Sequence, residues 1–245
     1  MEQGKVTVVI GAASGIGAAT AAVLEAAGHT VVKADLQAGH GCQPVDVSDE
    51  ASVEALFSEV VEEYGSFTGV VNCAGISTFG QVVDHDAAEF RRVLDVCLTG
   101  AFLVLKHAGR RVADGGSLVT LSSLNARQPG AGLVAYCAAK AGLVMLTEVT
   151  ALELGSRGVR VNAVSPGLVV TPLTEPAMGI PGVREDYLEN TPLGRSGEPE
   201  EIGAAIRFLL SDDAAWITGE NLDINGGAHL KRYPDLNKHI MAAFS

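Results

Sequence analysis

The chain has 245 residues, of which 47% are hydrophobic, and its formal net charge is −12. A length of about 250 residues without a break in composition is typical of one α/β domain. The acidic balance argues against nucleic acid or an anionic membrane as the main partner. The four cysteines show no Cys-x-x-Cys spacing and no histidine cluster beside them, which argues against a zinc site or a redox pair.

The sequence also bears on location. No apolar stretch approaches the roughly 18 residues of a membrane helix, and the first residues run directly into a Val/Ile-rich segment without the regions of a signal peptide. Free thiols fit a reducing compartment. The expected location is therefore the cytoplasm.

Short apolar runs rich in β-branched residues alternate with helical patterns along the chain. The predicted strands are Val6–Ile10, Thr30–Ala34, Gln43–Val45, Val70–Asn72, Ser117–Ser122, Val159–Val164 and Leu222–Ile224. The predicted helices are Ile16–Ala27, Asp49–Tyr64, Ala87–Leu94, Leu98–Val112, Tyr136–Ser156 and Pro199–Leu210. This alternation predicts right-handed crossovers and a doubly wound parallel α/β sheet in a single domain, residues 1–245.

Two segments depart from the alternation. Residues 172–199 are rich in proline and glycine, which predicts a long loop acting as a substrate lid. A C-terminal tail, residues 228–245, extends beyond the last predicted strand. Leu173 and Met178 in the lid are candidates for contact with an apolar substrate, and packing of the lid on its own domain explains them equally well.

A glycine-rich turn, Gly11-Ala-Ala-Ser-Gly-Ile-Gly17, connects the first predicted strand to the first predicted helix. Its glycines permit a tight turn, and the N-terminus of the helix offers free N–H groups to a pyrophosphate. Such a turn can also serve helix–strand packing alone, but its place after the first strand favours nucleotide binding. The candidate residues are Gly11, Ser14, Gly15, Ile16 and Gly17.

Asp35 ends the second predicted strand, 18 residues after Gly17. A carboxylate there can accept hydrogen bonds from the ribose hydroxyls of an adenosine and would repel a 2′-phosphate. Ser14 and Leu36 supply no cation beside it, so NAD is predicted in preference to NADP. Lys33 argues against this preference, because it lies on the same strand face as Asp35.

Tyr136 and Lys140 lie four residues apart, on one face of a predicted helix. A neighbouring ammonium favours phenolate over phenol, and such a tyrosine can exchange a proton with an alcohol or ketone near neutral pH. The same spacing occurs on solvated helix faces, so its meaning depends on the surrounding motifs.

Taken together, the motifs resemble those of the single-domain short-chain dehydrogenases/reductases, and the resemblance covers nearly the whole chain. It implies a Rossmann fold and a nicotinamide-dependent oxidoreductase. The motifs that carry it are Gly11–Gly17, Asn72–Gly75, Ser123, Tyr136–Lys140, Pro166–Gly167 with Thr171, Ile217–Gly219 and Asn225–Gly227.

The resemblance implies that Ser123, Tyr136 and Lys140 are the catalytic residues. Tyr136 would transfer the hydroxyl proton, Ser123 would hydrogen-bond the substrate oxygen, and Lys140 would hold the nicotinamide ribose and favour ionisation of Tyr136. Hydride transfer is the chemistry of the cofactor. The cofactor-binding residues that it implies beyond the glycine turn and Asp35 are Asp46, Val47, Asn72, Ala74, Gly75, Tyr136, Lys140, Pro166, Gly167, Val169 and Thr171.

Four features depart from the family pattern. Ile10 replaces the usual threonine before the glycine turn, and Asn225 replaces a frequent aspartate. The segment between Asp35 and Asp46 is too short for a full crossover helix. Cys97 stands where an asparagine commonly supports a proton relay, and it is interpreted as a small buried apolar residue, which puts the usual relay in question.

Several polar residues remain. Asn125 and Gln128 follow the candidate serine and are either substrate contacts or ordinary loop residues. His85, His107 and His229 are scattered and expected to face solvent, and no metal site is predicted.

The Tyr136–Ser156 helix has a second face that is too apolar for burial on one side only. In the family that the chain resembles, this helix commonly packs against its copy in a neighbouring subunit, and tetramers are frequent. A symmetric homo-oligomer, tetramer or dimer, is therefore predicted. The face comprises Ala139, Leu143, Leu146, Thr147, Val149 and Leu154.

The predicted function is NAD-dependent hydride transfer between nicotinamide and a secondary alcohol or ketone. One alternative is a reductase of 3-oxoacyl thioesters on an acyl carrier, although such enzymes usually prefer NADP and carry a basic residue where Ser14 stands. Another is a catalytically silent nucleotide-binding scaffold, against which Ser123, Tyr136 and Lys140 argue. No pattern in the lid or the tail encodes the substrate or the direction of the reaction.

Overall fold

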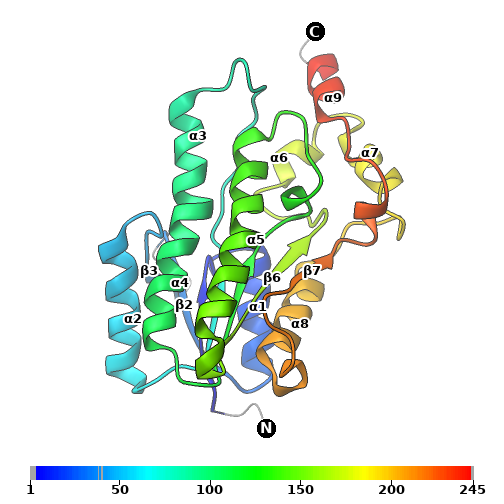
Figure 1. Ribbon diagram of the computed structural model, residues 1–245. Coiled ribbons are helices and arrows are strands. Elements are labelled where there is room, and N and C mark those ends of the chain that lie inside the picture. Colours follow the sequence, from blue (N-terminus) through cyan, green and yellow to red (C-terminus); the bar gives the residue numbers. More distant parts are fainter. Residues whose placement is uncertain (1–3, 38, 40, 244–245) are drawn as a thin grey trace.

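The computed structural model describes residues 4–37, 39 and 41–243. Seven strands form one parallel sheet, as predicted, and their order is β3-β2-β1-β4-β5-β6-β7 (Figure 1). The order reverses beside β1, which is where doubly wound sheets open a crevice at the carboxyl ends of their strands. The strands are β1 (Val6–Ile10), β2 (Thr30–Asp35), β3 (Gln43–Pro44), β4 (Gly69–Asn72), β5 (Ser117–Leu121), β6 (Arg160–Pro166) and β7 (Asn221–Ile224).

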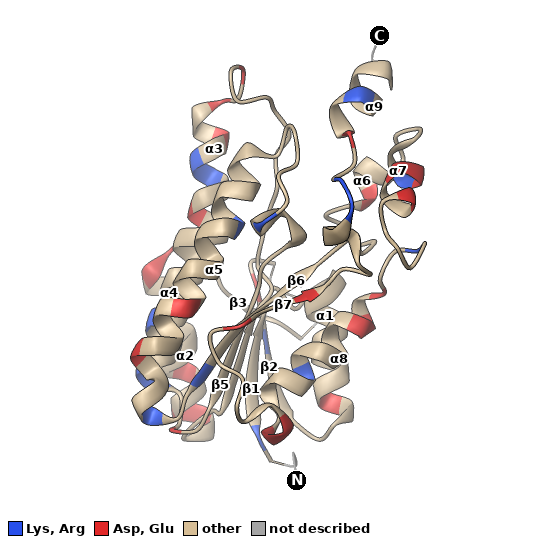
Figure 2. Cartoon of the chain, turned by 45° about the vertical axis from the view of Figure 1, so that its right-hand side comes forward, with Lys and Arg blue, Asp and Glu red and all other residues tan. Residues whose placement is uncertain are grey.

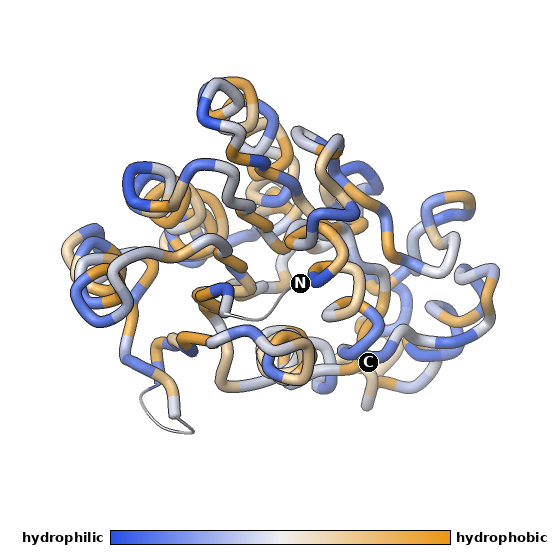
Figure 3. Tube along the Cα trace, turned by 90° about the horizontal axis from the view of Figure 1, so that it is seen from below, coloured by the Kyte–Doolittle hydropathy of each residue, from blue (hydrophilic) through white to orange (hydrophobic). Residues whose placement is uncertain are grey.

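Helices cover both faces of the sheet, because the strands are apolar on both sides. A core containing Phe57, Leu118 and Val104 joins one face to α2, α4 and α5, and a core containing Leu24 and Ile206 joins the other to α1 and α8. Seen from below, the helices stand in two rows with the strands between them (Figure 3). The helices are α1 (Gly15–Ala26), α2 (Glu50–Tyr64), α3 (Ala87–Leu94), α4 (Gly100–Arg111), α5 (Val134–Leu154), α6 (Glu175–Met178), α7 (Val183–Glu189), α8 (Pro199–Leu210) and α9 (Leu236–Ala243).

The helix α5 corrects the expectation that no segment could span a membrane. The 24-residue stretch Val134–Arg157 contains an 18-residue window with a mean hydropathy of 1.3, so by length and composition alone it could cross a membrane. However, α5 packs against β6, α3 and α4 and buries Ala135 and Lys140. Its apolar character is therefore accounted for by its place in the layer that covers the sheet.

The exposed apolar surface of α5 also differs from the predicted face. Ala139, Leu143 and Thr147 are buried within this chain: Ala139 packs with Val93 and Cys97, and Thr147 meets Thr120 on β5. The apolar residues that do reach the surface are Met145 and Leu152, the latter 84% exposed, with Val149 and, from α4, Phe102. We call these four residues the α4/α5 patch.

Residues 172–199 contain two short helices rather than a continuous loop, because local signals support them. Pro176 lies in the first turn of α6, where a missing N–H costs nothing. Glu185 and Asp186 lie in the first turn of α7, where negative charge is stabilising. The helices α6, α7 and α9 gather at the upper right of Figure 1, beyond the strands' carboxyl ends.

Charged residues are scattered over the outer faces of the helices rather than gathered into a basic surface (Figure 2). His107 is a correction to the sequence prediction, since it is only 1% exposed and not solvent-facing. Its ring faces α2 and lies 3.1 Å from a carboxylate oxygen of Glu50, with Arg111 on its other nitrogen. It therefore links α4 to α2.

Candidate active site

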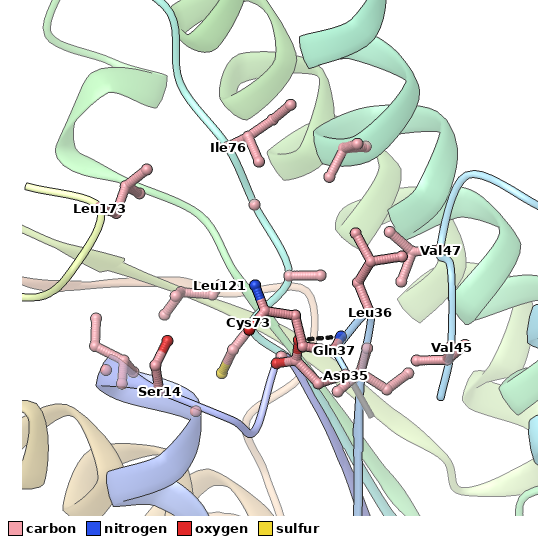
Figure 4. A pocket seen from close by; sticks show the side chains of 18 of the residues that line it. Ser14, Asp35, Leu36, Gln37, Val45, Val47, Cys73, Ile76, Leu121 and Leu173 are labelled. Carbon is pink, nitrogen blue, oxygen red and sulfur yellow. Dashed lines mark hydrogen bonds between the residues drawn. The ribbon is translucent and has the colours of Figure 1, made fainter. Parts of the chain in front are cut away.

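A cavity of about 510 Å³ opens at the carboxyl ends of the central strands. In Figure 4, Asp35 lies between Ser14 on the glycine turn and Val47 on the opposite wall. Most residues predicted to bind a cofactor surround this cavity. Those that line it are Gly11, Ser14, Gly15, Ile16, Gly17, Asp35, Asp46, Val47, Ala74, Gly75 and Thr171, with Leu173 from the lid segment.

The glycine turn is compact because two of its positions leave no room for a side chain. A Cβ on Gly17 would lie 2.0 Å from the carbonyl oxygen of Gly11, and one on Gly11 would lie 2.8 Å from the amide of Ala74. The amide of Ala18 makes the first intrahelical bond of α1, to Ser14, so the preceding amides lie ahead of the helical ladder. This end of α1 suits a pyrophosphate.

Asp35 is held in place by two backbone amides. Its Oδ2 accepts a hydrogen bond from Ala13 on the glycine turn at 3.0 Å, and its Oδ1 accepts one from Gln37 at 3.1 Å. Lys33, which argued for NADP in the sequence, instead forms an ion pair with Glu25 at 2.9 Å. The wall beside Asp35 therefore presents a fixed negative charge.

Sequence reasoning missed several residues of this cavity. Arg92 on α3 is a cation at its edge, but its guanidinium is paired with Glu89 at 2.7 Å. Burial raises the pKa of the Cys73 thiol to about 12, so this side chain is a neutral part of the wall. The other missed residues are Ile10, Leu36, Gln37, Val45, Ser48, Ile76, Val96, Leu121 and Pro172.

A second cavity of about 160 Å³ brings together Ser123, Tyr136 and Asn125. Leu173 lines both cavities, so the two adjoin at the lid. Met178 also lines the smaller cavity. Pro166 and Gly167 line the smaller cavity rather than the larger one.

Lys140 lies where the helix spacing predicted, beside Tyr136, with Nζ 5.5 Å from the centroid of its ring. It is only 2% exposed, and Nζ donates a hydrogen bond to the carbonyl of Leu121 at 2.6 Å. A side chain on Gly75 would begin 3.6 Å from Nζ. Gly75 and Leu121 line the larger cavity, so the buried ammonium lies behind this part of its wall and does not itself line the cavity.

Ser123 is positioned by its neighbours at the end of β5. Its Oγ accepts a hydrogen bond from the amide of Asn125 at 3.1 Å, and its carbonyl accepts one from Ser165 at 3.0 Å. Ser122 turns the other way, and its hydroxyl donates to the carbonyl of Lys140. Ser123, not Ser122, therefore faces the cavity, as the strand alternation predicted.

Cys97 is 1% exposed, in line with its interpretation as a buried residue. It lies in a π-helical turn, Asp95–Thr99, that joins α3 to α4. Its Sγ donates to the carbonyl of Ile76 at 3.2 Å and accepts from the amide of the same residue at 3.3 Å. Cys97 therefore fixes the backbone segment that follows Gly75.

Besides Lys140, three predicted residues line neither of the two cavities. Asn72 is buried and accepts a hydrogen bond from Ala74, so it shapes the turn after β4. Val169 is part of the core. Gln128 is a correction, because it does not line the smaller cavity and its amide donates instead to the carbonyl of Lys231 in the tail.

The carboxylate of Asp186 joins α7 to the tail. Its side chain is 8% exposed and accepts hydrogen bonds from Arg232 at 2.6 Å, the amide of Asp235 at 2.9 Å and His239 at 3.1 Å. Burial alone would raise the pKa of this carboxyl, but these donors outweigh it and hold the pKa below its usual range. The lid segment and the tail thus form one unit.

This lowered pKa makes a prediction about stability. Above the usual pKa of an aspartate, the ionised carboxylate makes its full contribution to folding stability. This contribution is lost as the pH falls through the lower pKa that Asp186 has in the folded protein. We expect Asp186→Asn to lower the free energy of unfolding by about 1–3 kcal/mol near neutral pH. Below about pH 4, the difference in stability between wild type and variant should become smaller. Urea unfolding at both pH values measures it; the exposed Asp213→Asn is the control, and an equal loss at both pH values would contradict the prediction.

Comparisons with known proteins agree with this geometry. The family model described as enoyl-(acyl carrier protein) reductase matches residues 11–229. The chain is 41% identical to cis-4-hydroxycyclohexanecarboxylate dehydrogenase of Sinomonas cyclohexanicum, over 91% of this chain and 96% of that protein. It is 39% identical to D-threitol dehydrogenase of Mycolicibacterium smegmatis, over 93% and 94%.

A solved structure of a short-chain type dehydrogenase/reductase from Mycobacterium ulcerans superposes with a TM-score of 0.94 at 33% identity, covering 99% of this chain and 96% of that one. The chain belongs to the short-chain dehydrogenase/reductase family. It is therefore an oxidoreductase of a family whose dehydrogenases use a nicotinamide cofactor, and the glycine turn with Asp35 fits the phosphate and ribose of such a group.

Proposed function

We propose that the protein is an NAD-dependent dehydrogenase of small secondary alcohols. The observation that carries the proposal is the shared cavity of Ser123 and Tyr136, which adjoins the cavity of the glycine turn and Asp35 through Leu173. A site for an alcohol oxygen thus lies beside a site for a dinucleotide.

The proposed roles follow from the contacts. Tyr136 accepts the hydroxyl proton of the alcohol during oxidation, and Ser123 hydrogen-bonds the same oxygen. Lys140 lies beside the Tyr136 ring and donates to the carbonyl of Leu121, which lines the larger cavity, and its ammonium can bind a ribose hydroxyl. The nicotinamide, when bound, supplies hydride acceptance.

Asp35 supports the preference for NAD. Its carboxylate is fixed by two amides, so it offers acceptors to ribose hydroxyls and opposes a 2′-phosphate. The cations that could offset this charge, Lys33 and Arg92, are paired with Glu25 and Glu89.

The smaller cavity supports a compact substrate. About 160 Å³ suits a few carbon atoms better than a long acyl chain, which disfavours a 3-oxoacyl thioester. The two similar dehydrogenases are named for a cyclic hydroxy acid and a four-carbon polyol, and both are compact secondary alcohols.

Cofactor reduction tests this proposal. The purified protein is given NAD or NADP with a panel of secondary alcohols, polyols, sterols and hydroxyacyl thioesters, and formation of the reduced cofactor is followed by absorbance. We expect turnover of small alcohols with NAD. Binding of NAD without turnover of any alcohol or ketone would favour a nucleotide-binding scaffold instead.

The α4/α5 patch supports a symmetric homo-oligomer. Each of its four residues is at least 44% exposed, and Met145, Val149 and Leu152 share one face of α5 because they are spaced i, i+4, i+7. We expect a dimeric or tetrameric mass by light scattering at micromolar concentration. Leu152→Glu should lower this mass toward that of a monomer, because association would bury the new charge. Val82→Glu, at an exposed valine elsewhere, is the control, and a monomeric wild-type mass would contradict the proposal.

A further inference from the structure

Two tyrosines that no sequence motif indicated line the smaller cavity together with Tyr136 and Ser123. Tyr187 comes from α7 and Tyr233 from the tail, and their hydroxyl oxygens lie 2.7 Å apart. Their rings pack edge to face, with centroids 5.8 Å apart. The pair therefore forms a polar spot in a cavity that is otherwise largely apolar.

The direction of each hydrogen bond at this spot can be assigned. The side-chain amide of Asn125 donates from Nδ2 to the carbonyl of Gln128 at 3.1 Å, so its Oδ1 faces Tyr233 as an acceptor. Tyr233 donates its single proton to that oxygen at 3.2 Å. The proton between the two phenols must therefore come from Tyr187.

With this assignment, the two tyrosines can accept a hydrogen bond from a ligand but have no proton left to donate to it. Both phenol protons are used within the network, while Tyr187 keeps free lone pairs on its oxygen. Burial is the main reason that the pKa values of both tyrosines are raised, so both stay neutral. A ligand group at this spot has to donate a hydrogen bond, as a hydroxyl group does and a carboxylate does not.

The cavity also lacks a partner for a negative charge. Among the described residues that line it there is no lysine, arginine or histidine. Burying a carboxylate or phosphate there without a counter-charge is unfavourable. The outer side of the same unit, by contrast, holds its charges apart from the cavity, in the Asp186–Arg232 pair that fixes α7 against the tail.

We propose that Tyr187, Tyr233 and Asn125 recognise a second hydroxyl group, so that the substrates are small neutral diols or polyols rather than hydroxy acids. This inference rests on the proposed function, because the first hydroxyl is the one at Ser123 and Tyr136. Of the two kinds of substrate named for the similar dehydrogenases, it selects the polyol.

The test compares matched four-carbon probes: sec-butanol, β-hydroxybutyrate and two butanediols, one vicinal and one with a carbon between the carbinols. With NAD and the wild-type protein, we expect kcat/KM for the better butanediol to exceed that for the other two probes by about tenfold, the effect of one good hydrogen bond. Tyr187→Phe should lower the ratio of diol to sec-butanol turnover by a similar factor, mainly through KM. Tyr64→Phe, on the surface, is the matched control.

Tyr233→Phe gives a result of a different kind. Removing this hydroxyl frees the proton of Tyr187, which can then donate to a ligand. We therefore expect β-hydroxybutyrate to improve relative to the diol in this variant. A wild-type preference for β-hydroxybutyrate, or equal probe ratios in wild type and both variants, would overturn the inference.

Binding separates this inference from the proposed function. Calorimetric titration of the protein–NADH complex with the same probes measures recognition without turnover. If a butanediol binds more tightly than β-hydroxybutyrate and Tyr187→Phe removes this preference, the hydroxyl site is supported. If, in addition, no probe is oxidised, only the proposed dehydrogenase activity is contradicted. Equal or tighter binding of the acid rejects the hydroxyl site.

Discussion

Tyr136→Phe should lower kcat by about a hundredfold to ten-thousandfold, the usual contribution of a positioned acid or base. The variant keeps the ring that packs beside Lys140 and loses only the hydroxyl. The affinity for NAD, measured by titration, should stay within about twofold, because the glycine turn and Asp35 are unchanged. Loss of turnover without loss of binding is the signature of a proton-transfer role.

Tyr64→Phe replaces a tyrosine on the surface and should leave kcat unchanged. If Tyr136→Phe keeps more than about a tenth of wild-type activity, a contribution of the size expected for general acid–base catalysis is absent, and another group moves the proton.

Asp35→Ala should raise the dissociation constant for NAD by about tenfold to a hundredfold, since hydrogen bonds to a charged group contribute about 1.5–3 kcal/mol. It should also relax discrimination against NADP, because the charge that opposes a 2′-phosphate is gone. The measurement is kcat/KM for both cofactors at saturating alcohol.

Asp35→Ala also removes the acceptor for the Ala13 amide of the glycine turn. A second variant therefore separates the effect of the charge from a change in the conformation of this turn. Asp35→Asn keeps one acceptor oxygen, which can still serve the Ala13 amide, and loses the charge together with the acceptor for Gln37, so it should relax cofactor preference with less effect on the glycine turn than Asp35→Ala. Asp84→Ala, at an exposed aspartate, is the control. An unchanged ratio of NAD to NADP efficiency in both Asp35 variants would remove Asp35 from the cofactor site.

The sequence predicted the fold and the location of the main site residues because local patterns determine both. Apolar strand runs and helical periods specify a parallel sheet, and the carboxyl ends of parallel strands meet at one edge. Asp35 and Ser123 lie at the carboxyl ends of predicted strands, so their convergence with the glycine turn was predictable. Tyr136 and Lys140 are neighbours on one helix turn.

Contacts that depend on tertiary packing were not predictable in this way. Tyr187 and Tyr233 are far apart in the chain and meet where contacts such as the Asp186–Arg232 pair hold α7 against the tail. His107 is buried because α4 faces α2, which its own surroundings in the sequence do not reveal. The partner of Gln128, a backbone carbonyl of the tail, carries no sequence signal at all.

One measurement tests the proposed chemistry most directly. The best alcohol from the cofactor-reduction panel is prepared with deuterium on its carbinol carbon and incubated with NAD and the protein, and the reduced cofactor and the ketone are analysed by mass spectrometry. We expect one deuterium in each reduced nicotinamide and an equal amount of ketone with the wild type, and a rate lower by at least about a hundredfold with Tyr136→Phe. Reduced cofactor without deuterium, or equal rates for the two proteins, would contradict direct hydride transfer assisted by Tyr136.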